Sequence, residues 1–257
     1  MSASLTTVLA ALRFVATVEE LEHCNSTNDV ARARAEAGAP AWTVVLAEAQ
    51  TAGRGRAGRA WWSPPGAHLY VSVVLRPTTP PERLAPLTLQ VALAMADAVL
   101  EVTGVRPTVK WPNDVLVAGR KVGGALTELV SHAQATAVIV GVGLDVAPIG
   151  ADAPPDVHAI GLSTVAGRTV TRAEAAVALL TALHRRVGEF AQRGFDPADW
   201  RAFPSTVGHR VTVHPPGAPA ITGLALDLRS DGALLVHVDG AAELVAVTAG
   251  DVTLEAS

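Results

Sequence analysis

The stretch AVIVGVGLDV (Ala137–Val146) is apolar along almost its whole length and rich in β-branched residues. Such a run is typical of a strand in a sheet that is covered on both faces. Trp42–Ala49 and Leu69–Leu75 have the same character, and Glu82–Val102 has the pattern of a long apolar helix that Gly104 ends. Buried strands that alternate with helices predict an α/β (α+β) fold.

Helix-start signals indicate two further helices. Ser26-Thr27-Asn28 stands before one of them, and Thr171 with Glu174 three residues later forms a capping box before the other. The first of these helices is predicted over Asp29–Ala37, and the second from Thr171 to about Gln192. Strands are predicted over Val109–Val117 and Ala125–Val130, and the proline-rich stretch over 147–158 is expected to be irregular.

The pattern changes near Pro204. Four short runs of alternating apolar and polar residues follow, separated by turns rich in Pro, Gly and Asp. They predict a small all-β module that resembles an SH3-like barrel, so we expect one domain over 1–204 and a second over 205–257. The four runs are Val207–His214, Ile221–Leu228, Ala233–Val238 and Glu243–Thr248.

Composition narrows the class of protein. The chain has 257 residues, of which 49% are apolar, enough for a large core. It has no apolar run long enough to span a bilayer and no recognisable signal peptide over Met1–Phe14, which predicts a cytoplasmic protein without a membrane partner. Cys24 stands alone, so neither an internal disulfide nor a cysteine metal site is expected. The formal charge of -4 argues against broad nucleic-acid binding.

The segment GRGRAG (Gly53–Gly58) fits the dinucleotide-binding pattern G-x-G-x-x-G in letters only. That pattern needs a helix directly after the glycines and an acidic residue about twenty positions later. Here the residues after the loop, 59–66, include two prolines and cannot start a helix, and Arg76 and Thr78 stand where the acid is needed. The dinucleotide interpretation is therefore rejected.

The same loop has the composition of an anion-binding site. Glycines offer backbone N–H groups at close range, and Arg54, Arg56 and Arg59 add planar donors that suit phosphate and carboxylate. A solvated basic turn and an RNA-binding RGG segment are the alternatives; three arginines disfavour the first, and the lack of repetition disfavours the second. Because clustered arginines repel one another, we expect residues 53–66 to be partly disordered until an anion binds.

Two further motifs point to the same ligand chemistry. In KWPND (Lys110–Asp114), proline stiffens a turn that presents an amide and a carboxylate, which suit a polar ligand or a metal–phosphate group. Lys121 stands just before Gly123-Gly124, where paired glycines indicate close approach of the backbone to a ligand. Each motif alone is commonly a turn or a solvated lysine. Together with the arginines they predict a site for an acyl adenylate.

In order and approximate spacing, these motifs resemble those of the biotin–protein ligases (biotin–acetyl-CoA-carboxylase ligases). The resemblance covers residues 26–146, and the pair GRGRxGRxW and KWPND is its most specific part. It implies a catalytic domain with a mixed β-sheet flanked by helices, followed by a small SH3-like C-terminal β-barrel. The matching segments are Ser26–Asn28, Gln50–Arg59, Ser63–Tyr70, Lys110–Asp114, Lys121–Gly124 and Gly141–Val146.

The resemblance also implies a two-step reaction. Biotin and Mg2+-ATP give biotinyl-5′-AMP and pyrophosphate, and biotin then passes to a lysine of a biotin carboxyl carrier protein domain. A carboxylate that attacks an α-phosphate is already an anion and needs no base, so cationic donors suffice for the first step. The alternatives are a lipoate–protein ligase and a non-catalytic regulator that binds biotinyl adenylate. A second copy of the chain, in a homodimer, is a further partner to consider.

Carried over residue by residue, the family pattern assigns three sets of residues. Biotin binding is assigned to Ser26, Thr27, Asn28, Gln50, Gly53, Arg54, Gly55, Arg56, Lys121, Gly123, Gly124 and Gly143. Nucleotide binding is assigned to Arg54, Arg56, Arg59, Trp61, Asn113 and Asp145. The expected catalytic residues are Arg54, Arg56, Lys121 and Asp114, the last as a hypothesis for positioning or deprotonating the acceptor lysine.

This chain departs from the family pattern at Asp145, where asparagine is usual. A carboxylate there repels phosphates unless Mg2+ lies between, so we expect Asp145 to face a metal or to have a raised pKa. No direct metal ligand is otherwise assigned, and Mg2+ is expected to arrive on the ATP phosphates. Some members carry an N-terminal DNA-binding domain; about twenty-five residues precede Ser26 here, so no operator binding is expected.

Overall fold

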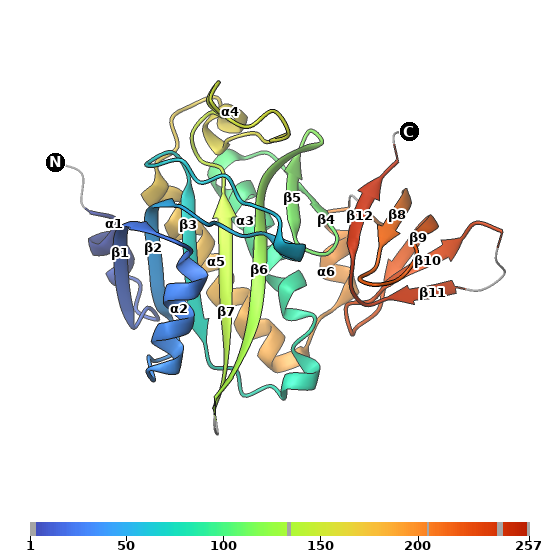
Figure 1. The fold of residues 1–257 in the computed structure, drawn as a ribbon, viewed down its shortest axis with the longest axis horizontal. Coiled ribbons are helices and arrows are strands. Elements are labelled where there is room, and N and C mark those ends of the chain that lie inside the picture. Colours follow the sequence, from blue (N-terminus) through green and yellow to red (C-terminus); the bar gives the residue numbers. More distant parts are fainter. Residues whose placement is uncertain (1–3, 133–134, 205, 241–243, 256–257) are drawn as a thin grey trace.

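A seven-stranded sheet forms the centre of the computed structural model, which describes residues 4–132, 135–204, 206–240 and 244–255 (Figure 1). Its strands are β1 (Thr17–Cys24), β2 (Thr43–Gln50), β3 (Leu69–Leu75), β4 (Thr108–Lys110), β5 (Asp114–Val117), β6 (Arg120–His132) and β7 (Ala135–Leu144). The strand order is β1-β2-β3-β7-β6-β5-β4. Only β1 and β2 pair in parallel, and the other neighbours are antiparallel. The mixed sheet of the predicted fold class is therefore confirmed.

Helices cover the two faces of this sheet unequally. The short α2 (Thr27–Glu36) packs on one face, while α3 (Leu87–Thr103) and α5 (Arg172–Arg193) cover the other (Figure 1). Successive residues of β2 point to opposite faces: Val44 lies in the large core with α3 and α5, and Val45 lies in a small core with α2. Both faces are thus apolar, which explains the unbroken apolar runs. Because α2 is short, it leaves part of this sheet face uncovered, and a cavity lies there.

The remaining helices are short. They are α1 (Leu5–Ala10), α4 (Leu162–Ala166) and α6 (Pro197–Arg201), and none of the three was predicted. The edge strand β1 was not predicted either, because its sequence TVEELEHC is polar and its side chains are largely exposed. Within the described ranges, no helix is both long and apolar enough to cross a membrane.

Two predicted strands have different boundaries in the structure. The run Val109–Val117 is a hairpin of β4 and β5, with KWPND at its turn and Lys110 paired with Asp114. Proline lacks the N–H that a continuing strand would use, which is why the ladder breaks there. The sequence predicts a short hairpin-like bend at Lys121, but in the structure Lys121 and its two glycines lie inside β6. The bend comes earlier, at Ala118 and Gly119, which both have positive φ as in a two-residue hairpin turn.

The C-terminal strands form a second, wholly antiparallel sheet. They are β8 (Arg210–His214), β9 (Ile221–Leu228), β10 (Leu234–Val238), β11 (Leu244–Val247) and β12 (Asp251–Leu254), in the order β11-β10-β9-β8-β12. The edges β11 and β12 do not pair within the described residues, so this SH3-like sheet is open. The strand β12 was not predicted. Glu243, at the start of a predicted run, and residue 205, at the predicted boundary, lie outside the described residues.

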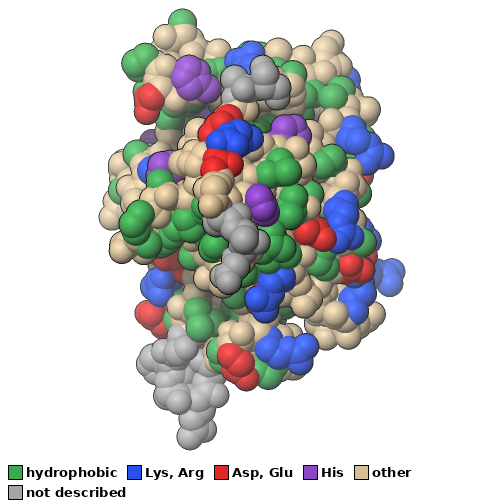
Figure 2. Space-filling model, turned by 90° about the vertical axis from the view of Figure 1, so that its right-hand side faces the viewer, with side chains coloured by type: hydrophobic (Ala, Val, Ile, Leu, Met, Phe, Trp, Pro, Cys, Tyr) green, Lys and Arg blue, Asp and Glu red, His purple; other side chains and the backbone are tan. Residues whose placement is uncertain are grey.

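The outward face of this second sheet is chemically mixed. Leu224, Leu226 and Leu244 are exposed on β9 and β11. Figure 2 looks onto this end of the molecule, where hydrophobic side chains are interspersed with charged ones and histidines. The inward-facing side chains, among them Val211 and Val236, belong to the large core of the first sheet. A single core therefore joins the two sheets, and the division at 204 stays a prediction.

Trp111 links the two sheets both by packing in their shared core and by hydrogen bonds. Its side chain is 2% exposed, and its Nε1 donates to the carbonyl of Gly232 at 3.0 Å. Its backbone N–H donates to Thr206 Oγ1 at 2.9 Å. The backbone N–H of Val109 donates to the carbonyl of Phe203 at 2.8 Å. The KWPND turn is thus held by the C-terminal part of the chain.

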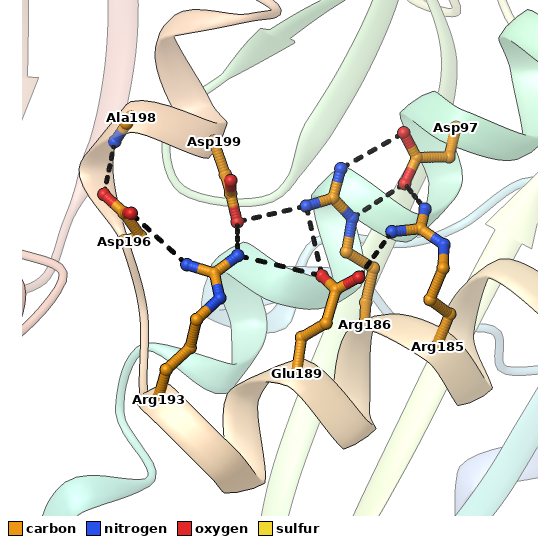
Figure 3. Close-up of polar contacts among 8 residues, drawn as sticks. All are labelled: Asp97, Arg185, Arg186, Glu189, Arg193, Asp196, Ala198 and Asp199. Atoms are coloured by element: carbon orange, nitrogen blue, oxygen red, sulfur yellow. Dashed lines mark hydrogen bonds and ion pairs between the residues drawn. The ribbon is translucent and has the colours of Figure 1, made fainter.

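A network of ion pairs fixes α6, the helix that leads into the second sheet (Figure 3). Arg186 on α5 is largely buried, and it contacts Asp97 on α3 at 2.7 Å and Asp199 on α6 at 3.2 Å. Arg193 adds a second contact to Asp199 at 2.6 Å. Exposed ion pairs contribute little, but a buried arginine shared by two carboxylates orients the elements that carry them.

The central position of Trp111 leads to a stability prediction. Replacing Trp111 by alanine should lower the free energy of unfolding by roughly 3–5 kcal/mol, because a large buried side chain and its hydrogen bond are lost. Urea unfolding followed by circular dichroism measures this change, and the transition should remain single because the core is shared. Leu129→Ala, at an exposed position on β6, is the control and should change stability by less than about 0.5 kcal/mol. An equal effect of the two variants would contradict the prediction.

Candidate active site

A cavity of about 230 Å3 opens on the sheet face that α2 only partly covers. It lies between the start of α2, the Gly/Arg loop (residues 53–59), the first half of β6, the C-terminal end of β7 and a segment over 156–159. Most of the predicted site residues line it: Ser26, Thr27, Asn28, Gln50, Arg54, Gly55, Arg56, Arg59, Trp61, Asn113, Lys121, Gly124, Gly143 and Asp145. Three predicted site residues do not line it: Gly53, Asp114 and Gly123.

Uncharged polar groups gather at one end of the cavity, called here the head-group end (Ser26, Thr27, Asn28 and Gln50). Gln50 Oε1 accepts the backbone N–H of Thr27 at 2.9 Å and lies 3.2 Å from its hydroxyl. Gln50 Nε2 donates to Ser63 Oγ at 3.1 Å. Ser26 is buried at the N-cap of α2, where its side chain makes no capping hydrogen bond. Its hydroxyl is therefore available to a ligand.

The three arginines of the Gly/Arg loop each have a partner within the chain. Arg54 makes a two-pronged ion pair with Asp29 on α2, and Arg59 contacts Asp251 on β12 at 2.9 Å. Arg56 Nη2 lies 3.5 Å from the carbonyl of Gly250, while its Nε is buried without a hydrogen-bond partner among the described residues. Burial lowers the pKa of Arg56, with Arg59 acting in the same direction. The expected repulsion is thus offset by acidic neighbours, and ligand-dependent ordering of the loop stays a prediction.

Lys121 stands beside the aromatic wall of the cavity. Its Nζ lies 2.6 Å from Asp114 Oδ1 and 5.0 Å from the ring centre of Trp61, within cation–π range. Asp114 also contacts Lys110 Nζ at 3.5 Å and is almost fully buried. Asp114 therefore lies behind Lys121, and this position suits orientation of the lysine better than contact with an incoming substrate.

The glycines of the site make room for side chains of the chain itself. A Cβ on Gly143 would come within 2.3 Å of the Trp61 ring, and one on Gly124 would lie 3.1 Å from Lys121 Nζ. Two others are closed off by backbone oxygens, Trp61 O at 2.8 Å for Gly53 and Gly143 O at 2.9 Å for Gly123. At all four glycines the closely approaching group is part of the protein itself, and the predicted approach of a ligand to their backbone stays a prediction.

Asn113 has a structural contact in addition to its place on the cavity wall. Its Nδ2 donates to the carbonyl of Ala125 at 2.7 Å, and the Ala125 N–H returns a hydrogen bond to the Asn113 carbonyl at 3.1 Å. This pair ties the KWPND turn to β6. The amide of Asn113 is thereby held at a fixed position beside the cavity.

Asp145 is buried at the end of β7 and still lines the cavity. Burial raises the pKa of Asp145 to about 7, although the charge of Lys121 acts in the opposite direction. His68 Nδ1 lies 3.8 Å from Asp145 Oδ1 and accepts the N–H of Val146 at 3.1 Å. Burial lowers the pKa of His68 to about 4, so this histidine is neutral and does not stabilise the carboxylate. A raised pKa was one of the two outcomes expected for Asp145.

The cavity also has walls that the sequence did not suggest. Residues 156–159 form part of its wall. The segment is held to β6 by hydrogen bonds from the Lys121 N–H to the His158 carbonyl at 3.2 Å and from the Ile160 N–H to the Lys121 carbonyl at 2.8 Å. This segment lies in the stretch taken as irregular, and no local signal reveals the pairing. The other unpredicted wall residues are Ala60, Trp62, Ala125, Leu126, Gly141 and Val142.

No group of three or more His, Cys, Asp and Glu side chains that could hold a metal ion occurs in the part of the chain that the structure describes. The cavity thus combines a head-group end of amides and hydroxyls with cationic side chains and a tryptophan. A site of this kind suits a small acid with a polar head whose carboxylate is joined to a phosphate. The fold and site together define a protein that binds an acyl phosphate ester.

Comparison with known proteins gives the family. Residues 21–145 match the Biotin/lipoate A/B protein ligase family. The chain is 38% identical over 235 residues to the biotin–[acetyl-CoA-carboxylase] ligase of Mycobacterium tuberculosis, covering 88% of this chain and 85% of that one. It is 32% identical over 220 residues to the bifunctional ligase/repressor BirA of Bacillus subtilis, covering 84% of this chain and 67% of that one.

Solved structures agree with the sequence relatives. The biotin protein ligase of Aquifex aeolicus in complex with biotin and ATP superposes with a TM-score of 0.79 at 27% identity, covering 93% of this chain and 99% of that one. The enzyme of Leishmania major in complex with biotinyl-5-AMP gives a TM-score of 0.56 at 29% identity, with 93% and 98% covered. The chain belongs to the biotin protein ligases, as its motifs predicted.

The raised pKa of Asp145 predicts a pH-dependent effect of its replacement. Between about pH 4, where an unfolded aspartate titrates, and about pH 7, the folded chain holds one more proton than the unfolded chain. The contribution of Asp145 to stability therefore falls as pH rises through this interval, and the loss is complete above it. Asp145→Asn has no such proton, so its stability relative to the wild type should increase from about pH 5 to about pH 8, by up to about 3 kcal/mol.

Urea unfolding of both proteins at several pH values measures this difference. Asp152→Asn, at an exposed position outside the cavity, serves as the control. A stability difference between Asp145→Asn and wild type that is constant over the pH range would show that Asp145 ionises normally.

Proposed function

We propose that this chain is a biotin–[acetyl-CoA-carboxylase] ligase. It activates biotin with ATP to biotinyl-5′-AMP and transfers biotin to a lysine of a biotin carboxyl carrier protein domain. The observation that carries the proposal is that the residues of the head-group end line the same cavity as Arg56 and Lys121. The relatives that are named biotin ligases, and the neighbours that hold biotin with ATP or biotinyl-5-AMP, support the same activity.

The residues of the head-group end would bind the ureido ring of biotin. That ring has one carbonyl acceptor and two N–H donors, and the head-group end offers both hydroxyl oxygens and amide N–H groups. The carboxylate at the other end of biotin would then meet Arg56 and Lys121. Backbone N–H groups of the Gly/Arg loop would add donors at this position.

In the first step, a carboxylate oxygen of biotin attacks the α-phosphorus of ATP and pyrophosphate leaves. The barrier arises largely from repulsion between anions, so cationic groups on both reactants lower it. We expect Arg56 and Lys121, which both line the cavity, to supply these charges. Arg54 is ion-paired with Asp29 in the structure. We propose that this ion pair holds the Gly/Arg loop against α2 and keeps Arg54 in a position from which it contacts the ligand.

The nucleotide would occupy the part of the cavity near Arg59, Trp61 and Asn113. Mg2+ would enter on the ATP phosphates and neutralise their charge. The carboxylates that line the cavity, Asp145 and Asp156, fit this ion as additional oxygen donors but do not form a complete site by themselves. With a pKa of about 7, Asp145 would be protonated in about half of the nucleotide-free molecules at neutral pH, and the protonated form resembles the asparagine usual in the family.

In the second step, the neutral amine of the acceptor lysine attacks the acyl carbon of the adenylate, and AMP leaves. We propose that Asp114 acts in both steps by holding Lys121 against the cavity. Its burial behind Lys121 argues against the alternative role as a base for the acceptor lysine. A cytoplasmic location, lack of operator binding and a homodimer also remain predictions.

One incubation tests the proposed function. Purified protein is mixed with labelled biotin or lipoate, ATP, Mg2+ and an apo carrier domain, and label on the carrier is measured by gel. We expect covalent label with biotin and none with lipoate. Label from lipoate would identify a lipoate ligase, and adenylate formed without transfer would favour a regulator.

Removal of either central cation should slow the first step. Arg56→Gln and Lys121→Gln should each lower kcat/KM for pyrophosphate release by about 100-fold or more, because a charge directed at the developing transition state is lost. Arg13→Gln, at an exposed arginine outside the cavity, should leave the rate unchanged. Variants that retain wild-type rates would exclude these residues from catalysis.

The two roles considered for Asp114 predict different kinetics for Asp114→Asn. If Asp114 positions Lys121, adenylate formation and transfer should both slow, by about tenfold. If Asp114 were the base for the acceptor lysine, only transfer from preformed biotinyl-5′-AMP would slow. Measuring the two steps separately distinguishes these roles, and unchanged rates in both steps would exclude each of them.

A further inference from the structure

Two polar side chains lie directly behind the head-group end without lining the cavity. Ser72 is fully buried in the middle of β3, and Glu128 is partly buried on β6. Neither was among the site residues suggested by the sequence. Both contact residues that do line the cavity, so they can determine how those residues are oriented.

Glu128 fixes the direction of the Asn28 amide. Asn28 Nδ2 donates to Glu128 Oε2 at 2.6 Å, and Arg32 Nη2 holds the other carboxylate oxygen at 2.9 Å. The reversed amide would place Asn28 Oδ1 against the carboxylate, where two acceptors would face each other. Gly141 lies directly beneath: a Cβ there would come within 2.1 Å of Asn28 Oδ1. Asn28 thus fills a space that only glycine leaves open.

Ser72 connects this amide to the rest of the head-group end. Its Oγ lies 2.6 Å from Asn28 Oδ1 and 2.7 Å from Thr27 Oγ1. The Thr27 hydroxyl is in turn 3.2 Å from Gln50 Oε1, and Gln50 Nε2 donates to Ser63 Oγ at 3.1 Å. The amide nitrogens of Asn28 and Gln50 therefore both face away from Ser72, and their oxygens face the hydroxyl groups between them. The orientation of both side-chain amides is therefore fixed by these partners.

We infer that Ser72 and Glu128 are positioning residues that set the donor and acceptor pattern of the head-group end, and thereby select an acid with a cyclic urea. This inference rests on the proposed function. The hydrogen bonds within the chain use one N–H of Asn28 and one of Gln50, which leaves the second N–H of each amide for a ligand carbonyl. The hydroxyl oxygens of Ser26 and Thr27 can accept N–H groups. A urea matches this pattern, whereas the dithiolane ring of lipoate has neither group.

Kinetics with three acids test this inference on the full chain. Pyrophosphate release is measured with biotin, with desthiobiotin, which keeps the urea but lacks the sulfur ring, and with lipoate. Ser72→Ala and Glu128→Ala should each raise KM about tenfold or more for both ureas, because Asn28 and Thr27 lose a buried partner. KM for ATP should stay within about twofold, since the nucleotide part of the cavity is untouched. Glu128→Gln keeps an acceptor oxygen and should restore most of the biotin affinity.

Matched controls separate positioning from loss of folding. Thr127 is next to Glu128 on β6, but its hydroxyl contacts Thr88 on α3 and does not line the cavity. The variant Thr127→Val should therefore leave all KM values unchanged. Thermal unfolding of each variant identifies general destabilisation. Unchanged KM for biotin and desthiobiotin in Ser72→Ala and Glu128→Ala, or an equal rise in KM for ATP, would overturn the inference alone. A wild-type chain that fails to adenylate biotin would overturn the proposed function and this inference with it.

Discussion

The site depends on holding several cationic side chains next to one cavity. Arg54, Arg56 and Lys121 would repel one another in a low-dielectric pocket, and the chain offsets this with carboxylates placed behind or beside them. Asp29 is on α2 and Asp114 is on β5, so two separate elements supply these carboxylates. The cations are therefore already oriented when a ligand arrives, and part of the ordering cost of binding is met during folding.

This arrangement also explains the role of the surrounding fold. The mixed sheet carries the head-group end on α2 and the lysine on β6, while the large core behind the sheet keeps these strands rigid. Trp111 joins that core to the C-terminal sheet through two hydrogen bonds at the KWPND turn. The same C-terminal sheet supplies Gly250 and Asp251 to the Gly/Arg loop. The second sheet is thus part of the site's support rather than an appendage.

Much of this could be predicted from the sequence, because the relevant signals are local. Continuous apolar runs identified β2, β3 and β7, and the glycines and arginines identified the loop that lines the cavity. The parts that were missed depend on contacts between distant residues. The segment over 156–159 reaches the site only by pairing with Lys121, and Ser72 is an ordinary strand residue until Thr27 and Asn28 are placed over it. The polar edge strand β1 was missed because its pairing with β2, rather than its own sequence, makes it a strand.

The contact between the Gly/Arg loop and β12 joins residues 192 positions apart, Arg59 and Asp251. A ribosome adds about 5–20 residues each second, so the loop leaves it roughly 10–40 s before its partner exists. During that interval the arginines have Asp29, made earlier, but neither Gly250 nor Asp251. The support of the loop is therefore completed only after Gly250 and Asp251 have been made, later than the residues that form most of the ligand-binding walls.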